Sequence, residues 1–224
     1  MITFSHQAHA AARSNTDINY LFRNPTLRNF TAGFYGGETK REVTRDGWQD
    51  TTISSARYYG YIGYDIVRWL NLYGILGAND AKLPNATTAD SELLYGLGVS
   101  FNLLNHSIRE PTPIEDAIRI NGDIRIISTE ANFPTGSISW QEITASLRFS
   151  LVNFPTGDKR YRPEAIAIYA GPAFSYIHSS NVEAKQNAGV TGGLEIFFFD
   201  SLSIDLNVEH YDTTSVFGGL NMRF

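Results

Sequence analysis

The sequence of 224 residues contains no cysteine and few charged residues. The lack of cysteine excludes disulfide bonds, thiolate metal sites and cysteine nucleophiles together. Charged residues make up 18% of the chain, whereas soluble domains carry nearer a quarter. The net charge of −5 gives no basic surface for nucleic acid, so no nucleic-acid partner is expected. No run approaches the ~18 consecutive apolar residues of a membrane-spanning helix.

Apolar and polar residues alternate instead, in segments separated by residues that favour turns. The clearest segment is 118–127, IRINGDIRII, with isoleucines at 118, 120, 124 and 126. Successive side chains of a strand point to opposite faces, so these four isoleucines share one face. The arginines and the aspartate lie on the other face. A helix would scatter the same residues around its circumference.

Ten segments with this pattern predict a closed, all-β, antiparallel barrel. They are long enough to cross a bilayer, which takes ~9–11 tilted residues, and even strand numbers are typical of bacterial membrane barrels. A barrel of eight strands is the alternative. We expect a barrel over 28–224, a long loop around 39–53, and long turns at 105–115 and 153–163. The predicted strands are 28–38, 54–66, 69–79, 91–104, 116–128, 138–152, 164–177, 186–198, 202–211 and 215–224.

Residues 1–27 form an N-terminal extension in this interpretation. Ala8-His9-Ala10 has the small-x-small form of a signal-peptidase site, but no basic segment or full apolar segment precedes it. Two interpretations stay open: the remnant of a signal peptide followed by a periplasmic segment, or an irregular terminus.

The placement of charge favours a membrane over water. On the predicted registers the apolar faces carry no charged residue, and the four lysines at 40, 82, 159 and 185 fall in predicted loops or turns. A charge facing lipid costs roughly 2–4 kcal/mol at the midplane for Arg or Lys, which explains an empty face. Eleven charged residues are expected to point inward: Arg57, Asp65, Arg119, Asp123, Arg125, Glu142, Arg148, Glu195, Asp205, Glu209 and Arg223.

These inward charges predict a plugged lumen. Barrels of ~8 strands have room only for side chains, so ten strands leave little free space. Buried charges must be paired to offset desolvation. We therefore expect Arg119, Arg125 and Arg148 to cross the interior and meet acids such as Asp123, Glu142, Asp205 and Glu209.

The C-terminal segment SVFGGLNMRF alternates apolar residues and ends in Phe224. It resembles the final strand of bacterial outer-membrane β-barrel proteins, and 28–224 resembles small barrels of the OmpA and OmpW type. The resemblance implies a location in the outer membrane of a Gram-negative bacterium, in contact with lipid and lipopolysaccharide. It also implies that Phe224 is an assembly signal read by the barrel-assembly machinery.

One segment near the predicted outer end of a strand suggests an enzyme. His178-Ser179-Ser180-Asn181 resembles the His-x-Ser-Asn element of lipid A deacylases. The resemblance implies His178 as base and Ser180 as nucleophile, with Glu183 or Glu195 as the group that orients the histidine. The element lies farther from the C-terminus than in that family, and the glutamate spacing does not match cleanly.

A second segment, Glu209-His210-Tyr211-Asp212, bears a likeness to the chemistry of omptin proteases, although those barrels are considerably longer. The five histidines show no useful metal-ligand spacing, and no phosphate-binding glycine loop is present, so neither a metal nor a cofactor is expected.

The sequence therefore predicts a non-catalytic outer-membrane barrel with a structural or interaction role and a largely plugged polar lumen. Its protein partner is not identified. The first alternative is a narrow pore for small solutes, and the second is a lipid A hydrolase that uses His178 and Ser180.

Overall fold

The computed structural model describes residues 29–44, 50–82, 91–108, 115–133, 136–154, 163–179, 183–198 and 201–224. Strands dominate these residues, and no helix among them is long and apolar enough to span a membrane. The strands are β1 (Phe30–Thr44), β2 (Thr51–Val67), β3 (Leu70–Lys82), β4 (Glu92–Ile108), β5 (Glu115–Phe133), β6 (Gly136–Phe154), β7 (Ala165–His178), β8 (Glu183–Ala184), β9 (Ala188–Phe198), β10 (Leu202–His210) and β11 (Thr214–Arg223).

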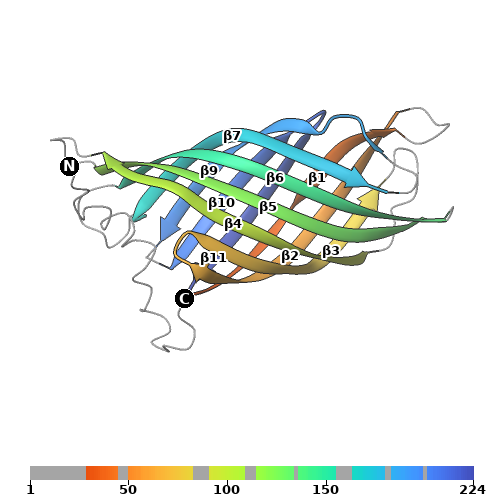
Figure 1. The fold of residues 1–224 in the computed structure, drawn as a ribbon. Helices are drawn as coiled ribbons and strands as arrows, with labels where there is room; N and C mark the ends of the chain where they lie inside the picture. Colours follow the sequence, from red (N-terminus) through yellow and green to blue (C-terminus); the bar gives the residue numbers. More distant parts are fainter. Residues whose placement is uncertain are drawn as a thin grey trace.

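Ten of these strands form a closed antiparallel barrel (Figure 1). Neighbours along the chain pair in order, and β11 pairs with β1 from Thr31↔Arg223 to Glu38↔Val216. Closure leaves no open sheet edge along the wall, which is the condition for strands to cross a bilayer. The all-β barrel expected from the alternation is confirmed, with ten strands rather than eight.

The barrel has two different ends. We call the end where β1 begins and β11 finishes the terminus end, and the opposite end the loop end. β5 and β6 are the longest strands, with 19 residues each, and they reach far toward the loop end (Figure 1).

The outer wall is apolar, as the alternation predicts. Leu97 is 71% exposed, and Ile62, Leu76 and Ile168 are exposed to a similar extent. Aromatic side chains exposed on the same surface include Tyr58, Tyr64, Trp69, Phe149, Phe174 and Tyr176. Monomeric proteins in water rarely expose a continuous apolar surface this large.

The strand ends differ from the expectation at the loop end. β1 runs to Thr44 and β2 begins at Thr51, so most of the loop expected at 39–53 is strand. Lys40 lies within β1 and Lys82 ends β3, which corrects their expected place in loops. At this end of β1 the outward face carries charged residues instead of apolar ones. The strand therefore lacks the apolar alternation on which the prediction relied.

Pro172 lies inside β7 without a bulge. The pairing of β6 with β7 keeps one register from Gln141↔His178 to Asn153↔Ile166, and the pairs missing from it are those of Gly171 and Pro172. The adjacent Gly171 lets the two backbones approach, because a Cβ there would lie 1.7 Å from the carbonyl oxygen of Leu147. The wall therefore accepts a residue without an N–H group at this point.

The interior is layered along the barrel axis. At the loop end lies the loop-end cluster, formed by the buried apolar residues Val43, Ala81, Ala131, Trp140 and Ile177. Charged and tyrosine side chains fill the middle. Buried apolar residues also lie among them, in a cluster formed by Tyr59, Ile75, Leu94 and Ile127. A third cluster lies near the terminus end and consists of Ala117, Val152, Ala165 and Ala167.

Candidate functional site

The structure places all eleven predicted inward charges on the lumen side of the wall. Arg57, Arg119, Glu142, Asp205 and Glu209 are buried, and the other six are partly buried. Their contacts divide them into a paired group near the loop end and a looser group near the terminus end.

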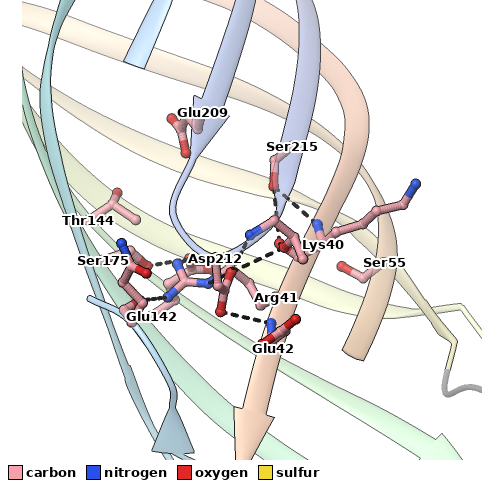
Figure 2. Close-up of polar contacts among 12 residues, drawn as sticks. Lys40, Arg41, Glu42, Ser55, Glu142, Thr144, Ser175, Glu209, Asp212 and Ser215 are labelled. Atoms are coloured by element: carbon pink, nitrogen blue, oxygen red, sulfur yellow. Dashed lines mark hydrogen bonds and ion pairs between the residues drawn. The ribbon is translucent and has the colours of Figure 1, made fainter. Parts of the chain in front are cut away.

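Glu142 on β6 is the centre of the paired group. Its carboxylate lies 2.7 Å from Nη1 of Arg57 on β2 and 4.0 Å from Nη1 of Arg41 on β1. Ser175 on β7 donates a hydrogen bond of 2.8 Å to the other carboxylate oxygen. Figure 2 shows Arg41 on β1 lying beside Glu142 and Ser175, which come from β6 and β7. The group joins opposite walls of the barrel beneath the loop-end cluster.

Arg41 and Asp212 complete this group, and neither was among the inward charges predicted from the alternation. Nε of Arg41 lies 3.7 Å from Asp212 Oδ1, and the guanidinium lies 4.3 Å from the ring centre of Tyr211. For Arg41, the sequence signal is its place between Thr39 and Val43, every second residue, which puts all three on the inward face of β1. The prediction did not include it because the predicted strand ended at residue 38. The Arg41–Glu142–Arg57–Asp212 group is called the charged layer below.

Arg125 meets an acid, as the sequence analysis expected. Its Nη2 lies 3.3 Å from Glu209 Oε1, its Nη1 donates to the hydroxyl of Tyr59, and its Nε donates to Thr144. Tyrosines supply partners that the sequence analysis did not anticipate. Tyr73 donates to Asp123 at 2.6 Å, and Tyr169 donates to Asp205 at 2.8 Å.

Arg119 and Arg148 correct the expected pairing. Among the described residues neither has an acidic oxygen within 4.0 Å. The Arg119 guanidinium lies 5.7 Å from the ring centre of Phe197, and that of Arg148 lies 5.0 Å from the ring centre of Tyr169. Cation–π contact takes the place of an ion pair. Tyrosine and serine hydroxyls already satisfy the nearby carboxylates, since Ser203 also donates to Glu195 at 2.7 Å.

A cavity of about 310 Å³ lies among these residues and continues into a mouth of about 840 Å³ at the terminus end. Arg119, Arg148, Asp123, Asp65 and Arg223 line both spaces, and Arg223 donates to Asp65. The terminus half of the lumen is therefore a polar space open at its mouth, whereas in the loop half the side chains leave a pocket of about 20 Å³.

Of the proposed catalytic side chains, those of His178 and Glu195 lie in the described part of the structure, and these two are far apart. His178 ends β7, and its exposed ring stacks on that of Tyr176 at 6.5 Å. Ser180 and Asn181 lie outside the described residues, and so does the Glu183 side chain, although the Glu183 backbone begins β8. Glu195 faces the lumen and is paired in register with Ala167. That places it roughly 35 Å along the wall from His178.

The omptin-like residues also point apart. Glu209 and Asp212 turn inward to Arg125 and Arg41, whereas His210 is exposed and lies 3.0 Å from the Thr214 hydroxyl. Within the described ranges, no group of three or more potential metal ligands is found.

Phe224 directly follows β11 at the closing seam. Its N–H donates to the carbonyl of Phe30 at 2.8 Å, and its carbonyl oxygen accepts from the N–H of Asn29 at 3.1 Å. The last residue is thus tied by its backbone to the beginning of the first strand.

Neither known protein families nor curated proteins give a match to this sequence. Solved structures do, at low identity. The transport unit of the autotransporter AIDA-I from Escherichia coli is 11% identical, with 95% of each chain covered and a TM-score of 0.46. The outer membrane protease OmpT from Escherichia coli is 12% identical over 89% of this chain and 98% of its own, with a TM-score of 0.33. Neisserial surface protein A is 13% identical over 87% of this chain and 96% of its own, also with a TM-score of 0.33. These neighbours are bacterial outer-membrane β-barrels.

Proposed function

We propose that this chain is a non-catalytic outer-membrane β-barrel with a structural or interaction role, whose lumen is closed at the loop end. The apolar outer wall supports a membrane location, because a wall of this kind is stable only against lipid. Lipid and lipopolysaccharide would then surround the barrel, with both termini on the periplasmic side. The barrel-assembly machinery would be its partner during insertion.

The closure is the observation that carries this proposal. The buried side chains of the loop-end cluster lie directly above the charged layer, and the pocket between them has a volume of about 20 Å³. An ion entering from the loop end would have to displace Trp140 and then break apart a buried set of paired charges. Breaking such a set is strongly unfavourable because it leaves charges uncompensated.

The polar cavity at the terminus end favours one second candidate, a narrow pore. Solutes of small size could enter its mouth of about 840 Å³. They would reach the charged layer and pass no farther unless that layer rearranges. Conductance therefore separates the two functions.

The test is single-channel recording in planar bilayers at neutral pH. We expect the wild-type protein to show no steady conductance. Trp140→Ala combined with Arg57→Met and Glu142→Gln removes the largest side chain of the loop-end cluster and the closest ion pair of the charged layer, and it should produce intermittent current. Gln141→Ala changes the next residue, which is exposed on the opposite face of β6, and should stay closed. A stable wild-type channel with porin-like conductance would overturn the proposal and establish the pore.

A further inference from the structure

The short strand β8 does not pair with β7 or β9, its neighbours along the chain. It pairs with β1 through Val43↔Ala184 and Thr44↔Glu183. In the barrel wall β10 and β11 lie between β9 and β1. Residues 183–187, which we call the strap, must therefore pass over the loop end of these two strands to reach β1.

The strap occupies an edge that the wall leaves free. β11 pairs with β1 only as far as Glu38, although β1 continues to Thr44. Side chains of the β10–β11 turn and of the start of β11 accept hydrogen bonds from the next backbone N–H groups of β1. Lys40 donates to Ser215 Oγ at 3.1 Å, and Glu42 donates to Asp212 Oδ2 at 2.9 Å (Figure 2). The strap pairs with the last residues beyond them.

The strap also covers the charged layer. The Arg41 Nη2 group donates a hydrogen bond of 2.7 Å to the carbonyl oxygen of Gln186, and Ala184 packs on the loop-end cluster. Lifting the strap would expose both features to the solution beyond the loop end. Its apolar contact is small, and water can replace the bond to Arg41, so the cost of opening is low compared with global unfolding.

Backbone hydrogen bonds and exposed ion pairs hold the strap. Besides the two residue pairs with β1, the N–H of Lys185 donates to the carbonyl of Glu42 at 3.1 Å, and the carbonyl of Asn187 accepts from the N–H of Ser175 at 2.8 Å. Water can replace these backbone bonds when the strap lifts, so the ion pairs of the Lys185 side chain are the part that salt weakens. Lys185 Nζ lies 3.0 Å from Glu42 Oε2 on β1 and 3.0 Å from Asp50 Oδ2 just before β2. The Lys185 side chain is 50% exposed and that of Asp50 is 49% exposed. Ion pairs in such positions are weak and are screened by salt.

Neutral pH does not disturb these pairs. The hydrogen bond from Lys185, followed by one from Thr44, lowers the pKa of Asp50. Hydrogen bonds to Asp50 and Glu42 raise the pKa of Lys185 to about 12. The Asp50 contribution is lost only as pH falls through its lowered pKa, and the Lys185 contribution only as pH rises through about 12. Salt is therefore the variable that weakens the strap near neutrality.

From this arrangement we propose that the strap is a salt-sensitive latch on the loop end of the lumen. When closed, it shields Arg41 and the loop-end cluster from the solution. When Lys185 loses its two acids, the strap lifts, and the charged layer becomes accessible from the loop end while the barrel wall stays intact. The latch rests on the closed lumen proposed above, but its test measures access to the cluster and not conductance.

The chain has no cysteine, so a single introduced thiol reports access. Ala81→Cys places it in the loop-end cluster at a position with no exposed surface. Its reaction rate with a neutral, water-soluble maleimide is measured on the folded barrel in detergent. Each rate is divided by that of His178→Cys, an exposed position at the same end, which removes any effect of salt on the reaction itself.

The comparison runs from about 0.01 M to about 1 M salt, where the screening length falls from roughly 30 Å to roughly 3 Å. We expect the normalised labelling rate to rise about two- to ten-fold with salt, since exposed pairs contribute weakly and the rate follows the open population. Adding Lys185→Gln should give the high rate already at low salt and remove the salt dependence.

Lys40→Gln is the matched control, because it removes a similarly exposed lysine ion pair, to Glu38 at 3.4 Å, from the same strand without touching the strap. It should leave the labelling rate and its salt dependence unchanged. The latch would be overturned if the labelling rate of Ala81→Cys in the otherwise wild-type chain did not depend on salt. It would also be overturned if Lys185→Gln and Lys40→Gln increased that rate equally. A conducting wild-type channel would instead overturn the closed lumen, so the two failures are distinguishable.

Discussion

At the scale of single residues, Glu142 shows why the interior tolerates so many charges. Its carboxylate accepts hydrogen bonds from Arg57 and Ser175 and lies within ion-pair distance of Arg41. Two charges removed from water lose hydration worth several kcal/mol each, and only close, hydrogen-bonded partners offset the loss. Arg57 has no other acid within 4.0 Å among the described residues, so it depends on this one carboxylate.

Replacing Glu142 with Gln should therefore destabilise the barrel. The change leaves the shape intact but leaves Arg57 uncompensated, and we expect a loss of about 3–5 kcal/mol in the free energy of unfolding. Denaturant unfolding in detergent, followed by tryptophan fluorescence, measures it. The double variant Arg57→Met/Glu142→Gln should recover most of the loss, because it removes the unpaired charge.

The exposed pair Lys40–Glu38 provides the comparison for this prediction. Both side chains are about half exposed, so Lys40→Gln should change the free energy of unfolding by less than about 1 kcal/mol. Equal losses for Glu142→Gln and Lys40→Gln would show that water reaches the charged layer and screens it.

At the scale of elements, alternation predicted the strands wherever one face is apolar. It placed all eleven inward charges and gave the number of wall strands. It failed at 39–44, where outward Glu38, Lys40 and Glu42 replace the apolar residues that identify a lipid-facing strand. It also failed at β8, because two residues carry no periodicity and their partner lies about 140 positions away.

The partners of the inward charges were harder to predict than their orientation. Alternation assigns a side chain to a face, but not to a height along the axis or to a position around the ring. Arg125 reaches Glu209 from a strand on another part of the wall, whereas Arg148 meets the Tyr169 ring on the adjacent strand. Only the registers between strands decide such choices, and no local pattern encodes them.

The register of β10 leads to a prediction about the outer wall. Leu206 is exposed in the middle of this strand, between inward Asp205 and Asn207. Leu206→Arg should cost roughly 2–4 kcal/mol because the arginine would face the middle of the bilayer. Refolding into lipid vesicles, followed by denaturant titration, measures the change.

His210→Arg is the control on the same strand and face. It lies at the loop end of β10, where the cost of an outward arginine falls to about 0–1 kcal/mol. Tolerance of arginine at both positions would mean that β10 does not cross the hydrocarbon layer as its register requires.

At the scale of the whole molecule, the barrel depends on one seam that joins the two ends of the chain. Every other pair of neighbouring wall strands follows one another along the chain, but β1 can complete its pairing only when β11, the last strand, is present. Contacts between residues so far apart in sequence form late, because loop closure is entropically costly. Until they form, β1 and β11 each present an unpaired edge, which is exposed to aggregation.

Phe224 lies at this seam, and it yields the last prediction. Its two hydrogen bonds to Asn29 and Phe30 come from the backbone, so Phe224→Ala keeps both and removes only the ring. The residue pairs between β1 and β11 also remain. The variant should therefore refold in detergent nearly as well as the wild type, as the heat-dependent gel mobility of the folded barrel would show. In cells, its level in the outer membrane should fall clearly if the ring is the signal for assembly, and Phe224→Tyr should restore much of it. Deleting Phe224 removes the backbone bonds as well, so a further loss of refolding in detergent would measure their separate contribution. Wild-type outer-membrane levels of Phe224→Ala would show that the ring is not the assembly signal, whatever the deletion does to refolding.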